Sequence, residues 1–187
     1  MNIDLPQLRK FYELKKIERA NSVGHRKESP AEHSWSCLIL ADYFLNKIKN
    51  QELDRLKVYE LLMYHDVVEI EAGDVNLLNE QEREHKAERE KQAAHVLQEH
   101  LPMELGQKFL ALFSEYEQGK TKEAKFAKAV DALDAVIHEL DYPNDWKGWT
   151  EDFLRKKKEH LFNEFPELKE MFEEILQFCR EKNIFNH

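Results

Sequence analysis

The chain has 187 residues, of which 42% are hydrophobic and 35% charged, and it contains only five glycines and five prolines. So few turn-forming residues, with a charged fraction above the usual quarter, argue against an all-β sandwich and favour long amphipathic helices. With 28 basic and 37 acidic residues the formal net charge is −9, which argues against a general attraction to nucleic acid or to anionic membranes.

The cysteines and the amino-terminal segment point to a cellular compartment. Cys37 and Cys179 provide neither a disulfide framework nor zinc-finger spacing. The opening segment MNIDLPQLRKFYELKK lacks the apolar stretch of a signal peptide, and no run of about 18 apolar residues occurs in the sequence. We therefore expect a cytoplasmic protein without a membrane partner.

The first third of the chain predicts helices separated by a polar loop. Residues 4–18 have the apolar spacing of a helix, and the polar loop 21–28 follows. The segment Ser-Pro-Ala-Glu at 29–32 combines capping-box spacing with a proline at the first helical position. These two signals predict a helix that extends to about residue 49.

The remaining segments also read as helices. A helix is predicted over 52–70, with a turn around Gly73, and the Glu-rich stretch 79–99 is interpreted as a solvated helix face. Further amphipathic helices are predicted at 104–117, at 121–141 and, interrupted at Pro166, over 150–184. The tail is rich in Trp and Phe, which indicates a helical cover on the domain or a dimer surface. The sequence predicts an all-α single domain of about seven or eight helices.

A few polar residues stand out because they interrupt apolar helical segments. The neighbours His65 and Asp66 lie in LLMYHDVVEI, and adjacent helical side chains diverge by about 100°, so both cannot face the core. Burying such a pair is unfavourable unless something coordinates it. Asp131 lies in the similarly apolar FAKAVDALDAVI, and His33 is in the first turn of its helix. Imidazole and carboxylate together suit a divalent ion of the Mn, Fe, Co, Ni or Zn group. Asp134 is either a surface neighbour or an acid behind the ligands.

These residues follow the pattern H…HD…D within the stretches PAEHSWS, MYHDVVEIEAGDV and EAKFAKAVDALDAV. In them the sequence resembles the HD superfamily of metal-dependent phosphohydrolases, and in particular its 5′-deoxynucleotidase branch (the YfbR-like and HD-domain-containing protein 2 group). The compound motif HDxxExxxGD is the most specific part of this likeness. The resemblance implies one HD domain over 1–187, with a ligand-bearing core at about 5–142 and a C-terminal helical extension at about 143–187.

The resemblance also assigns roles to individual residues. It implies that a divalent metal ion (Co, Mn, Zn, Ni, Fe or Mg) is held by His33, His65, Asp66 and Asp131. Glu69 and Asp74 match the acidic positions that order and deprotonate the attacking water.

A further residue is expected to hold the phosphate of the substrate. Arg19 approximately matches an arginine in the loop before the first ligand helix, and Arg26 is its rival. Members of the branch often have an aromatic residue next to this arginine, near the sugar, whereas Ala20, Asn21 and Ser22 follow here. The resemblance implies a small-molecule nucleotide substrate and a homodimer.

The predicted function is a metal-dependent phosphohydrolase, a 5′-deoxynucleotidase that cleaves deoxyribonucleoside 5′-monophosphates with a metal-activated water. A triphosphate or (p)ppGpp-like substrate is an alternative, because His25, Arg26 and Lys27 form a basic cluster with Arg19. A non-catalytic helical interaction module is the alternative of another class. A ferritin-like di-metal bundle and a zincin are disfavoured, since only one Glu-x-x-His and no His-Glu-x-x-His occurs.

Overall fold

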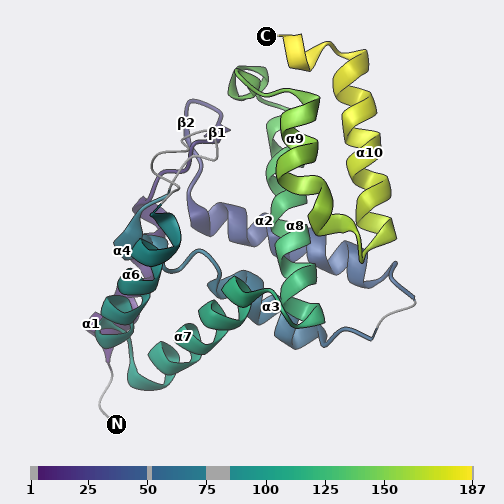
Figure 1. The fold of residues 1–187 in the computed structure, drawn as a ribbon. Helices are drawn as coiled ribbons and strands as arrows, with labels where there is room; N and C mark the ends of the chain where they lie inside the picture. Colours follow the sequence, from purple (N-terminus) through teal and green to yellow (C-terminus); the bar gives the residue numbers. More distant parts are fainter. Residues whose placement is uncertain (1–3, 50–51, 75–84, 187) are drawn as a thin grey trace.

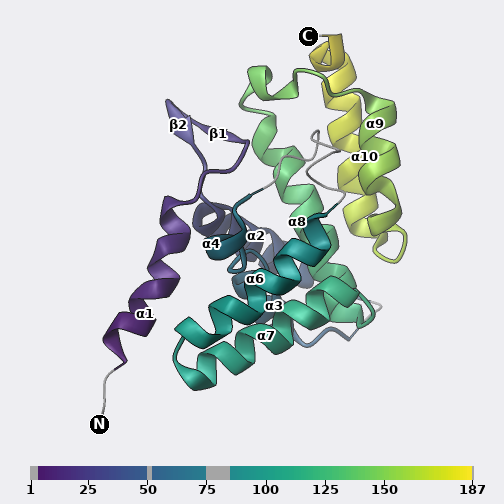
Figure 2. The same cartoon turned by 60° about the vertical axis from the view of Figure 1, so that its left-hand side comes forward.

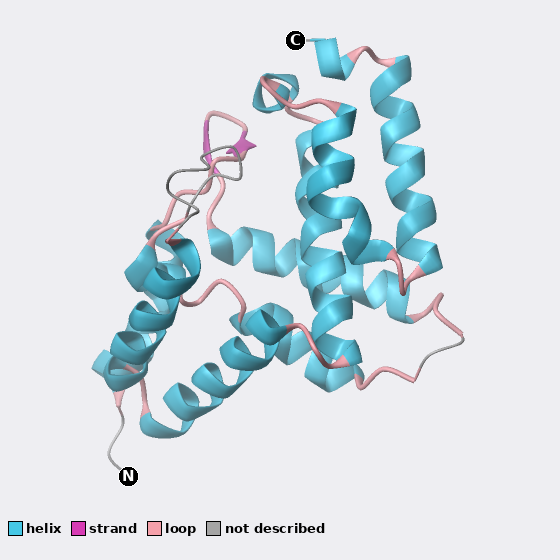
Figure 3. Cartoon of the chain, in the orientation of Figure 1, coloured by secondary structure: helices cyan, strands magenta, loops and turns pink. Residues whose placement is uncertain are grey.

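The computed structural model describes residues 4–49, 52–74 and 85–186, and these are mostly helical (Figures 1 and 3). The helices of the first half are α1 (Leu5–Phe11), α2 (Pro30–Leu45), α3 (Arg55–Tyr64), α4 (Glu69–Ala72) and α6 (Lys86–His100). The helices of the second half are α7 (Met103–Gln118), α8 (Lys122–Glu139), α9 (Glu151–Lys158) and α10 (Pro166–Glu181). Short 3₁₀ turns lie at Tyr12–Lys16, Pro143–Trp146, Glu159–Phe162 and Ile184–Asn186. The all-α prediction is confirmed.

Helix α8 lies at the centre of the fold and contacts α2, α3, α7 and α10 (Figure 1). Its buried apolar residues cover more than one face, which explains why neighbours surround it: Ala124, Phe126, Ala127, Ala129, Val130, Leu133 and Val136. Helices α6 and α7 pack on each other, and α4 packs on α6 (Figure 2). No helix among residues 4–49, 52–74 and 85–186 is long and apolar enough to cross a bilayer.

The start of α2 forms as its sequence predicts. The Ser29 hydroxyl accepts a hydrogen bond from the Glu32 amide, and the Glu32 carboxylate accepts one from the Ser29 amide, which completes a capping box. This start fixes the rotation of the helix, so that His33 begins the buried stripe of Cys37, Ala41 and Phe44. His33 is therefore directed into the molecule from the first turn.

The predicted helix 52–70 is wrong in its length. Helix α3 ends at Tyr64, and the chain continues in turns to α4. The His65 ring explains this end, because its Nδ1 atom donates to the Leu62 carbonyl over 2.7 Å. A continuing helix would use that carbonyl for the Asp66 amide. Hydrogen bonds that span three residues instead of four follow, such as that from the Glu69 amide to the Asp66 carbonyl at 2.9 Å.

Three other expectations need correction. The opening segment 4–18 is the short α1 followed by a 3₁₀ turn. The loop 21–28 contains a two-stranded antiparallel hairpin, β1 (Ser22–Val23) with β2 (Arg26–Lys27), which the sequence did not predict. Part of the stretch 79–99 lies outside the described residues, but α6 is not fully solvated, since Glu90 is buried.

The aromatic tail is a helical cover. Trp146, Phe162, Phe165 and Phe172 are all at most 1% exposed, and α10 packs on α8. These side chains complete the core of the chain itself, so they do not form an exposed patch.

Candidate metal centre

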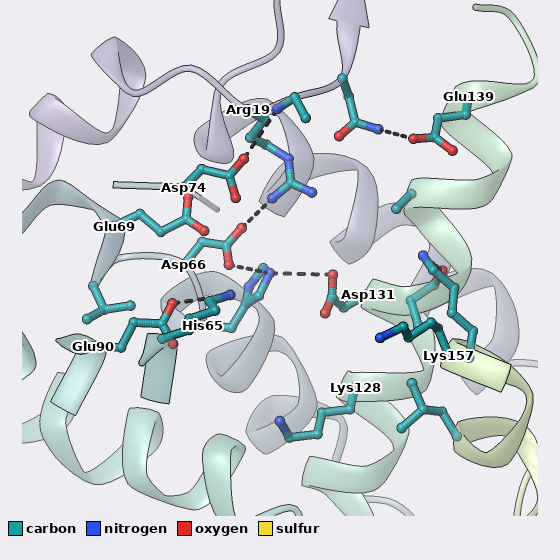
Figure 4. Close-up of a pocket in the computed structure, with 18 of the residues that line it drawn as sticks. Arg19, His65, Asp66, Glu69, Asp74, Glu90, Lys128, Asp131, Glu139 and Lys157 are labelled. Carbon is teal, nitrogen blue, oxygen red and sulfur yellow. Dashed lines mark hydrogen bonds and ion pairs between the residues drawn. The ribbon is translucent and has the colours of Figure 1, made fainter. Parts of the chain in front are cut away.

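Side chains from α2, from the end of α3 and from α8 converge on one point, and Figure 4 shows His65, Asp66 and Asp131 of this group. His33 Nε2 lies 2.9 Å from Asp131 Oδ1, and His65 Nε2 lies 3.2 Å from Asp66 Oδ1 and 4.0 Å from Asp131 Oδ1. Ligand atoms on one ion with bonds of about 2.1 Å are separated by about 3 Å when adjacent and about 4 Å when opposite. Three of the four residues predicted as ligands, His33, His65 and Asp131, thus lie at distances that suit one divalent ion. Asp66, the fourth, lies beside His65 but outside the group of potential ligand atoms that are all close to one another.

The protonation of His65 provides an independent test of this fit. Its Nδ1 atom donates to a carbonyl, so in the neutral ring, the form that binds metals, the lone pair is on Nε2. That Nε2 atom is buried and has no hydrogen-bond partner among the residues that the structure describes. A buried acceptor without a partner is unfavourable, because its hydration is lost and nothing replaces it. A cation at this point would use the lone pair, so the residues fit a metal.

His33 is oriented in a similar way by an acid behind it. Its Nδ1 atom is 2.9 Å from Asp134 Oδ2, and the Ser36 hydroxyl donates to the same oxygen over 2.8 Å. Asp134 is only 5% exposed. A carboxylate at Nδ1 keeps the proton there and directs Nε2 towards the centre, as is common for histidine ligands of metals. Of the two interpretations of Asp134, the acid behind a ligand is the one that the structure supports.

A cysteine that the sequence did not single out also touches the centre. Cys37 Sγ lies 3.5 Å from His33 Nε2, and with His33, His65 and Asp131 it forms a group whose potential ligand atoms all lie within 4.8 Å of one another. Burial raises the pKa of the Cys37 thiol to about 12. In the metal-free protein the thiol therefore stays neutral.

The predicted acids and arginines do not all lie at the centre. Arg19 Nη1 donates to Asp66 Oδ2 over 3.0 Å, and its Nε donates to Glu28 Oε2 over 3.2 Å. Asp74 accepts from the backbone amide of Ala20 over 3.2 Å, so it holds the loop that carries Arg19. Arg26 is exposed, pairs with the capping residue Glu32 and does not line the cavity.

The pKa values of the Asp66 and Glu69 carboxyl groups are shifted in opposite directions. Burial alone would raise the pKa of Asp66, but His65 and Arg19 outweigh it and hold that pKa well below the usual range. Burial and the negative charges of Asp66 and Asp74 raise the pKa of Glu69 to about 10. Its Oε2 atom is buried without a hydrogen-bond partner within the described part of the chain. Two neighbouring carboxyls with opposite shifts are typical of acid–base sites.

Comparison with known proteins identifies the family. A family model described as "HD domain" matches residues 11–169, which is most of the chain. The chain belongs to the HD-domain family. The human 5′-deoxynucleotidase HDDC2 is 28% identical over 138 residues, which cover 72% of this chain and 66% of the human protein, just under two thirds of its length. The 5′-deoxynucleotidase hdd1 of Schizosaccharomyces pombe is 27% identical over 72% of this chain and 70% of its own.

Solved structures show the same HD-domain fold. A predicted metal-dependent phosphohydrolase from Magnetospirillum magnetotacticum MS-1 superposes with a TM-score of 0.82 at 28% identity, covering 96% of this chain and 92% of that one. An HD-domain phosphohydrolase from Listeria innocua superposes with a TM-score of 0.68 at 20% identity, covering 96% and 90%. The second likeness concerns the fold alone.

The HD-domain centre opens into a cavity of about 650 Å³ that contains residues missed by sequence reasoning. Tyr116 donates its hydroxyl to Asp131 Oδ2 over 2.7 Å, and Lys86 pairs with the buried Glu90 at 3.2 Å. Lys128 and Trp149 line the same cavity. The i,i+4 spacing of Lys86 and Glu90 was readable in the sequence, but it is also the ordinary spacing of a solvated ion pair. For Trp149 and Lys128 the sequence carried no signal.

Proposed function

We propose that this HD-domain chain is a metal-dependent phosphohydrolase, and more narrowly a 5′-deoxynucleotidase that converts deoxyribonucleoside 5′-monophosphates to deoxyribonucleosides and phosphate. In this proposal the metal ligands are His33, His65, Asp66 and Asp131. The observation that carries it is the buried Nε2 of His65, which makes no hydrogen bond with the described residues and faces two carboxylates beside the guanidinium of Arg19. A metal ion, an anion-binding group and an acid–base pair are the parts that monoester hydrolysis requires.

The residues around such an ion would have separate roles in the reaction. A divalent metal would lower the pKa of a bound water and neutralise charge on the phosphoryl group. Arg19 lines the cavity and would hold the phosphate with the guanidinium N–H groups that Asp66 and Glu28 leave free. Glu69, whose pKa falls once a cation is near, accepts the proton of the attacking water. Asp74 positions the Arg19 loop through the Ala20 amide, and protonation of the leaving oxygen is a second role open to it.

The nucleotide class of the substrate is supported by the relatives and by the cavity. The human and fission-yeast relatives are named as 5′-deoxynucleotidases. A cavity of about 650 Å³ lies within the range of small-molecule sites and has room for a mononucleotide. Of the basic cluster that supported a triphosphate substrate, only Arg19 lines the cavity. Five lysines also line it, so a substrate with more phosphate groups is included in the test: Lys86, Lys128, Lys147, Lys157 and Lys158.

A substrate panel tests the proposed function. Metal-stripped protein receives Co²⁺, Mn²⁺, Mg²⁺, Ni²⁺, Fe²⁺ or Zn²⁺, and phosphate release is measured from deoxy- and ribonucleoside 5′-monophosphates, 3′-monophosphates, triphosphates and ppGpp. We expect metal-dependent release from the deoxyribonucleoside 5′-monophosphates alone. Release from another member of the panel would support a hydrolase and refute the proposed substrate class. Metal binding without release from any member would favour an interaction module.

Two variants separate the rival arginines. Arg19→Ala should raise KM for the preferred monophosphate roughly 10- to 100-fold, because a charge-assisted contact to phosphate is lost. Arg19→Lys should recover only part of this, since a lysine does not supply two parallel donors. Arg26→Ala is the matched control and should stay within about twofold, because its partner is Glu32 outside the cavity. Steady-state kinetics at saturating metal measure all three, and a larger effect for Arg26→Ala would reverse the assignment.

Two further expectations are part of this proposal on the basis of the resemblance alone. These are the homodimer and the treatment of residues 143–187 as an extension of one HD domain. Light scattering coupled to gel filtration tests the first, and proteolysis with mass analysis tests the second.

A further inference from the structure

A second polar pair lies in the cavity, and the proposed hydrolysis does not use it. Asn21 Nδ2 donates to Glu139 Oε1 over 3.0 Å, and both residues line the cavity (Figure 4). Glu139 is 7% exposed and Asn21 is 8% exposed. A buried carboxyl group in a ligand cavity is unfavourable unless it has partners, and the Asn21 amide supplies one. The pair therefore forms a preorganised polar site in the wall of the cavity.

Helix α8 fixes how far this pair lies from the metal centre. Asp131 and Glu139 are on the same helix and both line the cavity. With a rise of about 1.5 Å per residue, they are separated by about 12 Å along the helix axis. That length is comparable to an extended nucleoside monophosphate, from its phosphorus to the far edge of its base. The loop that carries Arg19 leads to the same end, because Asn21 follows Arg19 by two residues.

Small side chains make up part of the cavity wall. Ala132 and Ala135 line the cavity from α8, and Ala20 lines it from the loop between Arg19 and Asn21. Methyl-sized side chains leave room for a sugar and a flat ring. Trp149 adds an aromatic surface to the same cavity. These residues are suited to the apolar faces of a nucleoside, and the same cavity is also lined by charged side chains such as those of Lys128 and Lys158.

The chemistry of Glu139 indicates what it would bind. A carboxylate has about four acceptor positions on its two oxygens, and Asn21 occupies one on Oε1. Burial raises the pKa of Glu139 to about 7, and the positive charge of Lys158 opposes that rise. New N–H donors from a ligand would stabilise the carboxylate. Each nucleobase carries at least one such donor, and guanine carries two side by side on one edge.

We infer that Glu139, positioned by Asn21, is a specificity-determining residue that accepts hydrogen bonds from the N–H groups of the substrate's nucleobase. The inference rests on the proposed function, since it assigns one end of a nucleotide to the end of the cavity opposite the metal. It predicts a preference for the guanine nucleotide, and it predicts that Glu139 is irrelevant to a substrate without a base.

The test compares deoxyguanosine 5′-monophosphate with 2-deoxyribose 5-phosphate, which has the same phosphoester and no base. For Glu139→Ala and Glu139→Gln we expect KM for the nucleotide to rise roughly tenfold or more, as for a lost hydrogen bond to a charged group. KM and kcat for the sugar phosphate should stay within about twofold of wild type. Glu123→Gln is the matched control, because Glu123 is also a buried carboxylate on α8 but accepts from the Asp54 amide, outside this cavity.

The outcomes separate this inference from the proposed function. Equal losses for both substrates, or no loss for either, would overturn the role of Glu139. If wild type releases phosphate from no nucleotide, the proposed function fails, and calorimetric binding of deoxyguanosine to wild type and Glu139→Gln then decides the inference alone. Binding that weakens tenfold in the variant supports it. Equal binding to both proteins, or no binding to wild type, refutes it.

Discussion

Asp66→Ala is expected to abolish metal binding and phosphate release together. The variant removes the Oδ1 atom that lies 3.2 Å from His65 Nε2, and it also removes the partner of Arg19. The centre then keeps two imidazoles and one carboxylate, and the negative charge that favours a divalent ion is halved. Because hydrolysis requires the ion, activity should fall to background at metal concentrations that saturate wild type. Metal content by elemental analysis and phosphate release measure the two losses.

Asp134→Asn provides a graded comparison for this result. Asp134 touches His33 Nδ1 and cannot reach the ion itself, so its loss should weaken metal affinity by about 10- to 100-fold and leave turnover recoverable at high metal. Added metal should raise the melting temperature of wild type and of Asp134→Asn, but not that of Asp66→Ala, because only a bound ligand stabilises the native state. Full metal occupancy in Asp66→Ala would remove Asp66 from the ligand set.

Much of this centre was readable in the sequence because local rules fix it. The capping box at Ser29 and Glu32 sets the start and rotation of α2, and with them the direction of His33. The apolar surroundings of Asp131 predict an acid that needs a partner, and it has two, His33 and Tyr116, although its side chain is 32% exposed. These inferences use neighbours within one helix, where spacing determines direction, so the structure agrees with them.

The errors arise where a long-range or side-chain contact overrides helical periodicity. The bond from His65 to the Leu62 carbonyl ends α3, so His65, Asp66 and Glu69 converge on one cavity although a straight helix would direct the first two apart. The pairing of Asn21 with Glu139 joins positions far apart in the chain. Spacing within a helix carries no information about such a contact, so the sequence could not place the far end of the cavity.

Glu69→Gln is expected to keep the metal and to lose most of the turnover. Glu69 is buried beside Asp66 and Asp74, and it is not one of the four residues that the proposal assigns to the metal. Glutamine keeps the shape of the side chain but cannot accept a proton. Loss of a positioned general base lowers kcat by about 10²- to 10⁴-fold, and we expect a fall in this range with KM changed far less. Stopped phosphate assays at saturating metal measure it, and elemental analysis verifies the metal.

A pH titration of stability tests the environment of Glu69 without any turnover. In metal-free protein the folded-state pKa of Glu69 is raised to about 10 from an ordinary value of 4.5, so the folded chain binds more protons than the unfolded chain between these values. Glu69 therefore lowers the free energy of unfolding as pH rises through that window. Glu69→Gln lacks this effect, so the melting temperature of the variant minus that of wild type should increase as the pH rises from about 5 to about 8. Parallel pH profiles of the two proteins would show that Glu69 is not desolvated. Near-normal turnover in the variant would show that it is not the base, and Asp74 would then be the remaining member of the predicted acid pair.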